Sequence, residues 1–194
     1  MQIVVGISGA SGICLGHLTV RALLDAGHDV HLVMTKDACL TALEEMGHEF
    51  SSVTKFIETF GEQKRLHSHT IHDFRAPIAS GSFSVDGMII IPCSMASLAA
   101  IAMGLSDNLL RRAADVTLKE RRPLVIVPRE TPFNDIHLEN MLKLSRMGAT
   151  IVAPIPAWYT RPKTLEDVER FIVGRALDAL KIENNLYPKW TGSL

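Results

Sequence analysis

The segment QIVVGISGASGICLGHLTVRALLDAGHDVHLVM, residues 2–34, sets the fold class. Gln2–Ile7 is a run of mostly apolar residues, which is typical of a strand buried on both faces. Gly12–Ala26 places apolar residues on one face of a helix, and Asp29–Met34 is a second short apolar strand. A strand, a helix and a strand in succession predict two parallel strands with a covering helix between them.

The same alternation continues along the chain. Further buried strands are predicted at Met88–Ile91, Leu124–Val127 and Ala149–Val152, and helices at Lys36–Met46, Ser97–Met103, Leu109–Lys119, Ile136–Met147 and Thr164–Leu180. This order predicts a doubly wound α/β fold, Rossmann-like or flavodoxin-like, whose parallel sheet is covered on both faces. We expect a single α/β domain over residues 1–182.

Two segments depart from this alternation of strands and helices. Residues 50–84 are polar and end in a run of small residues, so irregular structure is predicted there. Residues 183–194 have little periodicity but contain Tyr187 and Trp190. Because aromatic side chains gain little in a solvated tail, we expect this tail to pack on a neighbouring subunit or over the ligand pocket.

The charges balance, with 20 Lys and Arg residues against 21 Asp and Glu residues. This balance argues against a nucleic acid or an anionic membrane as partner. No apolar run approaches the roughly 18 residues of a membrane span, and the N-terminus lacks a signal peptide's basic region. Cys14, Cys39 and Cys93 form no CxxC pair. We therefore expect free thiols in a reducing compartment, the cytoplasm.

Two loops are candidates for ligand binding, because ligands of doubly wound sheets bind beyond the carboxyl ends of the strands. The first, Gly6–Gly12, has glycines that let the backbone approach a phosphate beside free N–H groups at a helix start. It departs from GxGxxG, so a mononucleotide fits better than a dinucleotide. The second, Pro92–Ser97, offers hydroxyls at another helix start. A structural turn or a plain helix cap is the alternative at each loop.

Charged residues are dense between residues 111 and 130. A charge run on a helix is usually a solvated face, and we expect this of Arg111, Glu120, Arg121 and Arg122. Arg129 and Glu130 are different, because they follow a buried strand directly, where binding loops gather. An arginine there can bind a phosphate through two N–H groups, and a carboxylate beside it can act as an acid or a base.

The run DNLLRRAADVTLKERRPLVIVPRETPFNDIHLENMLKLSRMGA, residues 107–149, resembles the signature of the UbiX/Pad1-type flavin prenyltransferases. With the opening GASG, the Pro-Cys-Ser loop, Trp158-Tyr159 and the closing Pro188-Lys189-Trp190, the similarity spans nearly the whole chain. The resemblance implies a flavin-binding domain that transfers a dimethylallyl group from dimethylallyl phosphate to N5 and C6 of reduced FMN. The product, prenylated FMN, would serve a UbiD-type decarboxylase, with ubiquinone biosynthesis as one use. The family forms large homo-oligomers, dodecamers among them.

The resemblance also implies roles for individual residues. FMN would be held by Gly9, Ala10, Ser11, Thr35, Ser94, Met95, Ala96, Ser97 and Arg129. The prenyl phosphate would lie among Arg112, Lys119, Glu130, Tyr159 and Arg175. The catalytic residues would be Ser11, Glu45, Lys119 and Glu130, with Glu44 as the alternative to Glu45. Departures are mild: Thr35 stands where Ser is common, Phe74 where some relatives carry Trp, and Met95-Ala96 where some have Thr-Gly.

The implied chemistry accounts for these residue types. Ionising an allylic C–O bond makes a carbocation and a phosphate, so the site needs cations for the phosphate. Arg112, Lys119 and Arg175 would supply them, Glu130 would be the acid for the departing phosphate, and Ser11 with Glu45 would relay the ring proton. No DDxxD motif is present, which fits a monophosphate donor and no metal.

Other interpretations remain. A flavin-dependent cysteine decarboxylase would share this fold and FMN, but that family has a PASANT-type loop and a PxMNxxMW segment where this chain has PCSMAS and PRETPFNDIHLENM. A decarboxylase in its own right and a non-catalytic flavin carrier are further alternatives. His67, His69 and His72 suggest a metal cluster but lack a Cys or HExxH frame, so no metal is expected. Cys93 is expected to be a buried small apolar residue rather than a nucleophile.

Overall fold

Six parallel strands form the centre of the molecule, in the order β3-β2-β1-β4-β5-β6. The computed structural model describes residues 1–192. Its strands are β1 (Gln2–Ile7), β2 (Asp29–Met34), β3 (Leu66–His69), β4 (Gly87–Cys93), β5 (Leu124–Pro128) and β6 (Thr150–Ile151). The helices are α1 (Ile13–Asp25), α2 (Lys36–Met46), α3 (Val53–Glu58), α4 (Met95–Ala102), α5 (Leu109–Lys119), α6 (Asp135–Arg146) and α7 (Leu165–Ala179). The predicted doubly wound α/β class is confirmed.

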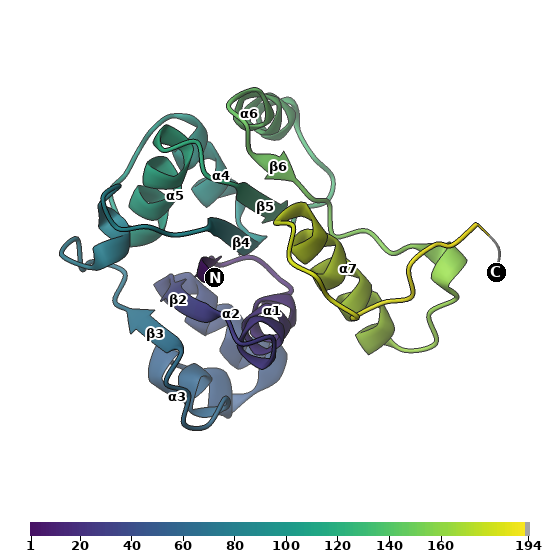
Figure 1. Ribbon diagram of the computed structural model, residues 1–194. Helices are drawn as coiled ribbons and strands as arrows, with labels where there is room; N and C mark the ends of the chain where they lie inside the picture. The colour runs from purple at the N-terminus through teal and green to yellow at the C-terminus, as the bar shows by residue number, and fades with distance from the viewer. Residues whose placement is uncertain (193–194) are drawn as a thin grey trace.

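The sheet has a buried cluster on each face, because successive strand residues point to opposite sides. Ile3, Val5 and Ile7 of β1 pack in one cluster with α1, α2, α3 and α7. Val4 of β1 packs in the other, with residues of α4, α5 and α6. Figure 1 shows these helix groups on the two sides of the sheet. The continuous apolar strands seen in the sequence are therefore strands covered on both faces.

The strand order reverses at β1, which pairs with β2 on one side and with β4 on the other. The loop after β1 and the loop after β4 leave the sheet in this region, at its carboxyl edge. Ser8 ties the two loops together: its Oγ donates to the carbonyl of Pro92 at 3.2 Å and accepts from the N–H of Ser94 at 2.7 Å. The fold thus holds the two candidate binding loops side by side.

The sequence did not reveal two elements. The segment predicted to be irregular contains the short helix α3 and the edge strand β3, which pairs with β2 from Val30 to Val33. The strand sequence is LHSH, so it lacks the apolar run that marks the buried strands. An edge strand needs a hydrogen-bonding partner more than apolar side chains, and that partner is not visible in the local pattern. The last strand, β6, has two residues, fewer than predicted.

The C-terminal segment lies along α7 of its own chain. Tyr187 donates its hydroxyl proton to Asp178 and packs so close to the helix that a Cβ on Gly174 would lie 2.4 Å from its ring. Asn184 donates to the carbonyl of Gly174 at 3.2 Å. Figure 1 shows this segment and the chain before α7 as an arm that extends away from the sheet. Contact of the arm with a neighbouring subunit stays a prediction, and residues 193–194 lie outside the described part.

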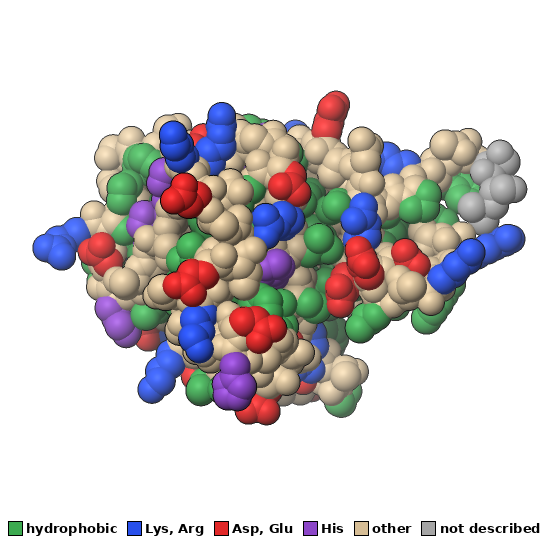
Figure 2. All heavy atoms as spheres, turned by 90° about the horizontal axis from the view of Figure 1, so that it is seen from below, with side chains coloured by type: hydrophobic (Ala, Val, Ile, Leu, Met, Phe, Trp, Pro, Cys, Tyr) green, Lys and Arg blue, Asp and Glu red, His purple; other side chains and the backbone are tan. Residues whose placement is uncertain are grey.

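The surface carries both signs of charge. Figure 2 shows acidic and basic side chains interspersed over one face of the molecule, in keeping with the balanced composition. Among residues 1–192, no helix combines the length and the apolar character needed to cross a membrane.

Candidate functional site

Two cavities open at the carboxyl edge of the sheet, on either side of the loop after β1. We call the first the α1–α7 cavity. It has a volume of about 480 Å³ and is lined by Ser11, Gly12, Cys14, Leu15, Glu45, Met46, Arg129, Pro154, Leu165, Val168, Glu169 and Ile172. We call the second the hydroxyl cavity. It has a volume of about 180 Å³ and is lined by Gly9, Thr35, Lys36, Asp37, Ile71, His72, Ser94, Ala96, Ser97, Asn108 and Arg111.

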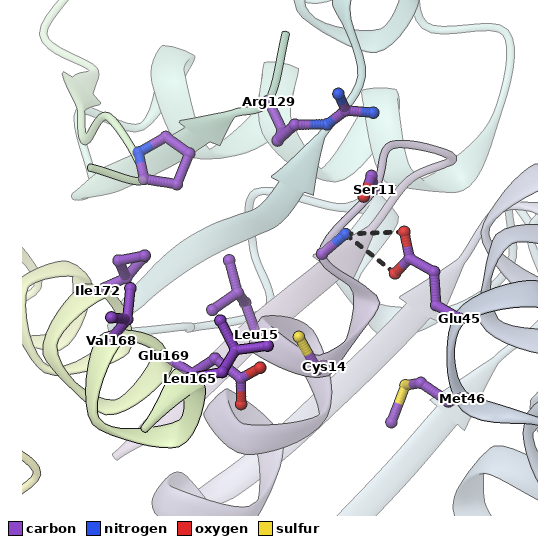
Figure 3. A pocket seen from close by; sticks show the side chains of 12 residues that line it. Ser11, Cys14, Leu15, Glu45, Met46, Arg129, Leu165, Val168, Glu169 and Ile172 are labelled. Carbon is purple, nitrogen blue, oxygen red and sulfur yellow. Dashed lines mark hydrogen bonds between the residues drawn. The ribbon is translucent and has the colours of Figure 1, made fainter. Parts of the chain in front are cut away.

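The start of α1 is already occupied by a carboxylate of the protein. The N–H of Gly12 donates to both oxygens of Glu45, at 3.1 and 3.0 Å, and the N–H of Ile13 donates to Oε2 at 3.0 Å (Figure 3). A helix start attracts an anion, and here the anion comes from α2. The prediction that this helix start offers free N–H groups to a phosphate is therefore wrong. Of the neighbouring pair Glu44 and Glu45, it is Glu45 whose carboxylate reaches the cavity.

The rest of the α1–α7 cavity is largely apolar, with Leu15 from α1 and Ile172 from α7 among its lining residues. Figure 3 shows Arg129 extending above Ser11, and Cys14 beside Glu169. The Nε atom of Arg129 is buried and has no hydrogen-bond partner. Burial, reinforced by the adjacent carboxylate of Glu169, raises the pKa of the Cys14 thiol to about 12. Cys14 is therefore an uncharged lining residue at ordinary pH. Arg129 has an N–H donor that no protein group accepts, which suits a ligand with an acceptor atom.

The hydroxyl cavity gathers short polar side chains from the ends of β1, β2 and β4. Thr35 caps α2 and Ser94 caps α4, each accepting the N–H of the residue three positions on, at 3.1 and 3.3 Å. Gly9 faces Asp37 so closely that a Cβ on Gly9 would lie 2.4 Å from the Cβ of Asp37. The cavity also contains cationic side chains, among them Arg111. Hydroxyls, a helix start and cations together suit a phosphate-bearing ligand.

Comparison with known proteins identifies the family. The family model described as Flavoprotein matches residues 1–177. A protein of Alkalihalophilus pseudofirmus named flavin prenyltransferase UbiX is 53% identical, over 96% of this chain and 94% of the relative. One of Methanocaldococcus jannaschii with the same name is 44% identical, over 98% of each chain. The chain belongs to the UbiX family of flavin prenyltransferases.

Solved structures of UbiX proteins share this fold closely. AnUbiX (PadA1), whose crystal structure is a complex with FMN and dimethylallyl pyrophosphate, is 41% identical with a TM-score of 0.90, over 100% of this chain and 98% of the other. A dodecameric FMN-dependent UbiX-like decarboxylase of Escherichia coli O157:H7 is 44% identical with a TM-score of 0.90, over 99% and 100% of the two chains. PPC decarboxylase, at 19% identity, shares the fold alone.

Most residues that the UbiX resemblance assigns to FMN line one of the two cavities. The hydroxyl cavity contains Gly9, Thr35, Ser94, Ala96 and Ser97, whereas Ser11 and Arg129 line the α1–α7 cavity. Ala10 is buried and Met95 is partly buried in the first turn of α4, and neither lines a cavity described above. Which atoms of these residues contact a flavin stays a prediction.

The residues assigned to the prenyl phosphate line no common cavity of the described chain. On α5, Arg112 pairs with Asp115 at 2.8 Å and Lys119 pairs with Glu120. Arg175 of α7 bonds to Asp178 at 3.1 Å, beside a different hollow. The remaining two are Glu130, exposed after β5, and Tyr159, exposed in the arm. None of the described cavities is lined by more than one of these five residues, so a shared pocket for the prenyl phosphate stays a prediction.

Several lining residues were not predicted. Lys36, Asp37 and Asn108 lie at helix starts, and α7 supplies one wall of the α1–α7 cavity. Helix starts after strands were visible in the sequence and could have indicated the first group. The wall from α7 had no local signal, because its position depends on packing against α1.

Two features of the sequence have plain structural explanations. Cys93 is fully buried, as predicted, and burial raises the pKa of its thiol to about 12. His67 and His69 lie on β3 and stack against His31 of β2, at ring distances of 4.9 and 5.3 Å. Within residues 1–192, no group of three His, Cys, Asp or Glu residues is arranged to hold a metal ion.

Proposed function

We propose that this chain transfers a dimethylallyl group from dimethylallyl phosphate to N5 and C6 of reduced FMN, giving prenylated FMN for a UbiD-type decarboxylase. The observation that carries the proposal is the pair of cavities on either side of the loop after β1, in a chain of the UbiX family. A reaction between two phosphorylated substrates needs a separate anion site for each phosphate and a common space in which the reacting atoms meet.

The residues present fit a flavin mononucleotide. In this proposal its phosphate lies in the hydroxyl cavity, near Ser94 and Ser97, and its ring system reaches past the loop toward Ser11 and Arg129. The unpartnered Nε of Arg129 then gains an acceptor on the ring edge. Reduced FMN supplies the nucleophilic N5 and C6 atoms. The chain's task is to bind, orient and exclude water around them.

The apolar lining of the α1–α7 cavity suits a five-carbon allylic chain. In the reaction, the allylic C–O bond breaks and the phosphate leaves with the bonding electrons. New bonds form to N5 and C6. The N5 proton is taken up by the departing phosphate, and the proton lost at C6 balances the one added to the alkene. Glu130 passes a proton to the departing phosphate and regains one from N5, and Glu45, held by two N–H groups next to Ser11, is placed to accept the proton lost at C6.

The second anion site is completed by neighbouring copies. Arg112 and Lys119 are seven residues apart, so they project from one side of α5. Arg175 lies on α7 with Tyr187 and Asp178 around it. Around α6, the apolar side chains of Ile136, Leu138 and Leu142 are each at least half exposed. Such apolar surface supports burial against other copies, and one relative of similar fold is dodecameric.

A single reaction tests the proposal. The protein is incubated without oxygen with FMN, a reductant and dimethylallyl phosphate, and the mass of the extracted flavin is measured. FMN should gain one C5H8 unit, and EDTA should not change the yield. Glu130→Gln keeps the size of the side chain but cannot transfer a proton, so turnover should fall by about 10²–10⁴ with flavin still bound. Unchanged flavin mass under reducing conditions would overturn the proposal and leave a flavin carrier.

The product's recipient is inferred from the same family. A UbiD-type decarboxylase added to the completed reaction should gain activity, whereas the prenylating protein alone should not release carbon dioxide from an aromatic acid. Free Cys14, Cys39 and Cys93 support a reducing compartment such as the cytoplasm.

A further inference from the structure

Arg111 lies in the hydroxyl cavity, where the charge run of α5 gave no reason to expect it. The sequence pattern predicts a solvated helix face for this residue, and that prediction is wrong. Its side chain is 18% exposed, and it lines the cavity together with Gly9, Thr35 and Ser97. The cause is its place in the first turn of α5, which brings it to the carboxyl edge of the sheet.

The guanidinium of Arg111 is held by Asp107 through one nitrogen and has an unpartnered N–H at another. Its Nη1 donates to both oxygens of Asp107, at 2.7 and 2.9 Å. Its Nε is buried and has no hydrogen-bond partner. A buried donor without a partner costs about 1–3 kcal/mol, and native proteins nearly always satisfy such a group. The arginine is therefore oriented by Asp107 and has a donor left for a ligand.

The charges around the two cavities indicate which of them binds the phosphate of a flavin. At the start of α1, the N–H groups of Gly12 and Ile13 already bind the carboxylate of Glu45, which would repel a phosphate. At the start of α4, the cavity presents hydroxyls and the cations Lys36 and Arg111; the carboxylate of Asp37 lines it and that of Asp107 pairs with Arg111, but neither occupies the helix start. The phosphate end of a flavin belongs on the α4 side.

We propose that Arg111 binds the phosphate of the flavin and makes the site prefer FMN over riboflavin. This inference rests on the proposed function, in which FMN is the acceptor. Asp107 acts as a positioning residue: it holds Nη1 of the guanidinium and leaves Nε without a partner in the protein. The alternative is a purely structural ion pair between residues four positions apart, which would stabilise the helix slightly and have no influence on the ligand.

The experiment compares two flavins that differ only in the phosphate. Dissociation constants for FMN and for riboflavin are measured by fluorescence quenching with the wild-type protein, Arg111→Met and Arg111→Gln. Loss of a charge-assisted contact should weaken FMN binding about 10- to 100-fold, whereas riboflavin affinity should not change. Arg111→Gln keeps a hydrogen bond to Asp107, and so gives a second result if the Met variant folds poorly.

A matched control is Arg65→Met. Arg65 also pairs with an aspartate, Asp29, but it does so at the amino end of β2, away from the cavity. Its loss should leave the ratio of the two dissociation constants unchanged. An equal loss for both flavins in the Arg111 variants, or no loss for either, overturns the inference. A wild-type protein that binds no FMN would instead overturn the proposed function, so the two failures are distinct.

Discussion

Gly9 shows how little space the turn between the two cavities allows. Its position admits no Cβ, because that atom would meet both the side chain and the backbone of Asp37. The sequence indicated a close approach of backbone and ligand at this glycine. The close approach that the structure records is between the loop after β1 and the start of α2. That contact joins two segments distant in the sequence, so local patterns could not predict it.

Replacing Gly9 by alanine should therefore damage the site through the protein's own packing. In Gly9→Ala, the start of α2 must move, which should cost about 1–3 kcal/mol of unfolding free energy and weaken FMN binding. Gly104→Ala is the control: its Cβ would have open space but a positive φ of 73°, so it should lose about 1 kcal/mol of stability and keep FMN affinity. Thermal denaturation and flavin titration measure both effects. Wild-type FMN affinity in Gly9→Ala would contradict this account.

Helices and strands with a strong apolar periodicity could be predicted from the sequence. A strand that depends on pairing with another strand could not. The helix predicted at Leu109–Lys119 has those bounds in the structure, because its apolar face and its Asn108 cap are local features. The edge strand β3 was missed, since its sequence alternates no apolar residues. What holds it is the ladder with β2 and a stack of imidazole rings, with Nδ1 of His31 3.0 Å from Nε2 of His69.

This stack makes the edge of the sheet sensitive to acid. Burial, and then the neighbouring imidazoles, lowers the pKa of His31 to about 4, against about 6.5 in an unfolded chain. The neutral form is thus favoured by folding, so stability is complete above pH 6.5 and is lost as the pH falls toward 4. Between pH 7 and 5 the loss of unfolding free energy due to His31 should be about 2 kcal/mol.

Chemical denaturation at both pH values measures this loss. In His31→Gln the dependence on pH should be shallower than in the wild-type protein. His17 keeps part of the dependence, since burial also lowers its pKa to about 4. Replacing the exposed His48 by glutamine should leave the wild-type dependence in place. A His31→Gln protein as sensitive to acid as the wild type would show that the stack is not responsible.

At the scale of the whole molecule, the resemblance to the UbiX family indicated functional residues that one chain does not bring into a common cavity. The flavin residues follow four neighbouring strands, β2, β1, β4 and β5, so the fold alone brings most of them to the two cavities. Arg112 and Arg175 belong to different surfaces, and no property of one chain's sequence states which surfaces of different copies meet. In the function proposed above, assembly of several copies completes the second anion site.

Oligomers that combine two variant chains would show whether one site takes its residues from different copies. If Arg112 and Arg175 of one site come from different copies, co-expressed Arg112→Ala and Arg175→Ala chains should form some sites with both arginines intact. Random assembly gives roughly a quarter of the sites both native sides, and turnover should recover to about that share of the wild-type value. Co-expressed Arg112→Ala and Lys119→Ala chains should show no recovery, because those residues share one helix. Lack of rescue in the first mixture would place the whole site in one copy.

The loop after β1 contributes Gly9 to one cavity and Ser11 with Gly12 to the other. It is a shared partition, fixed at one end by Asp37 and at the other by Glu45, so its two sides cannot shift independently. We therefore expect a ligand that displaces the loop on one side to change the compartment on the other. In the function proposed above, the flavin contacts both compartments, so we expect it to bind first and to complete the compartment in which the allylic donor then binds.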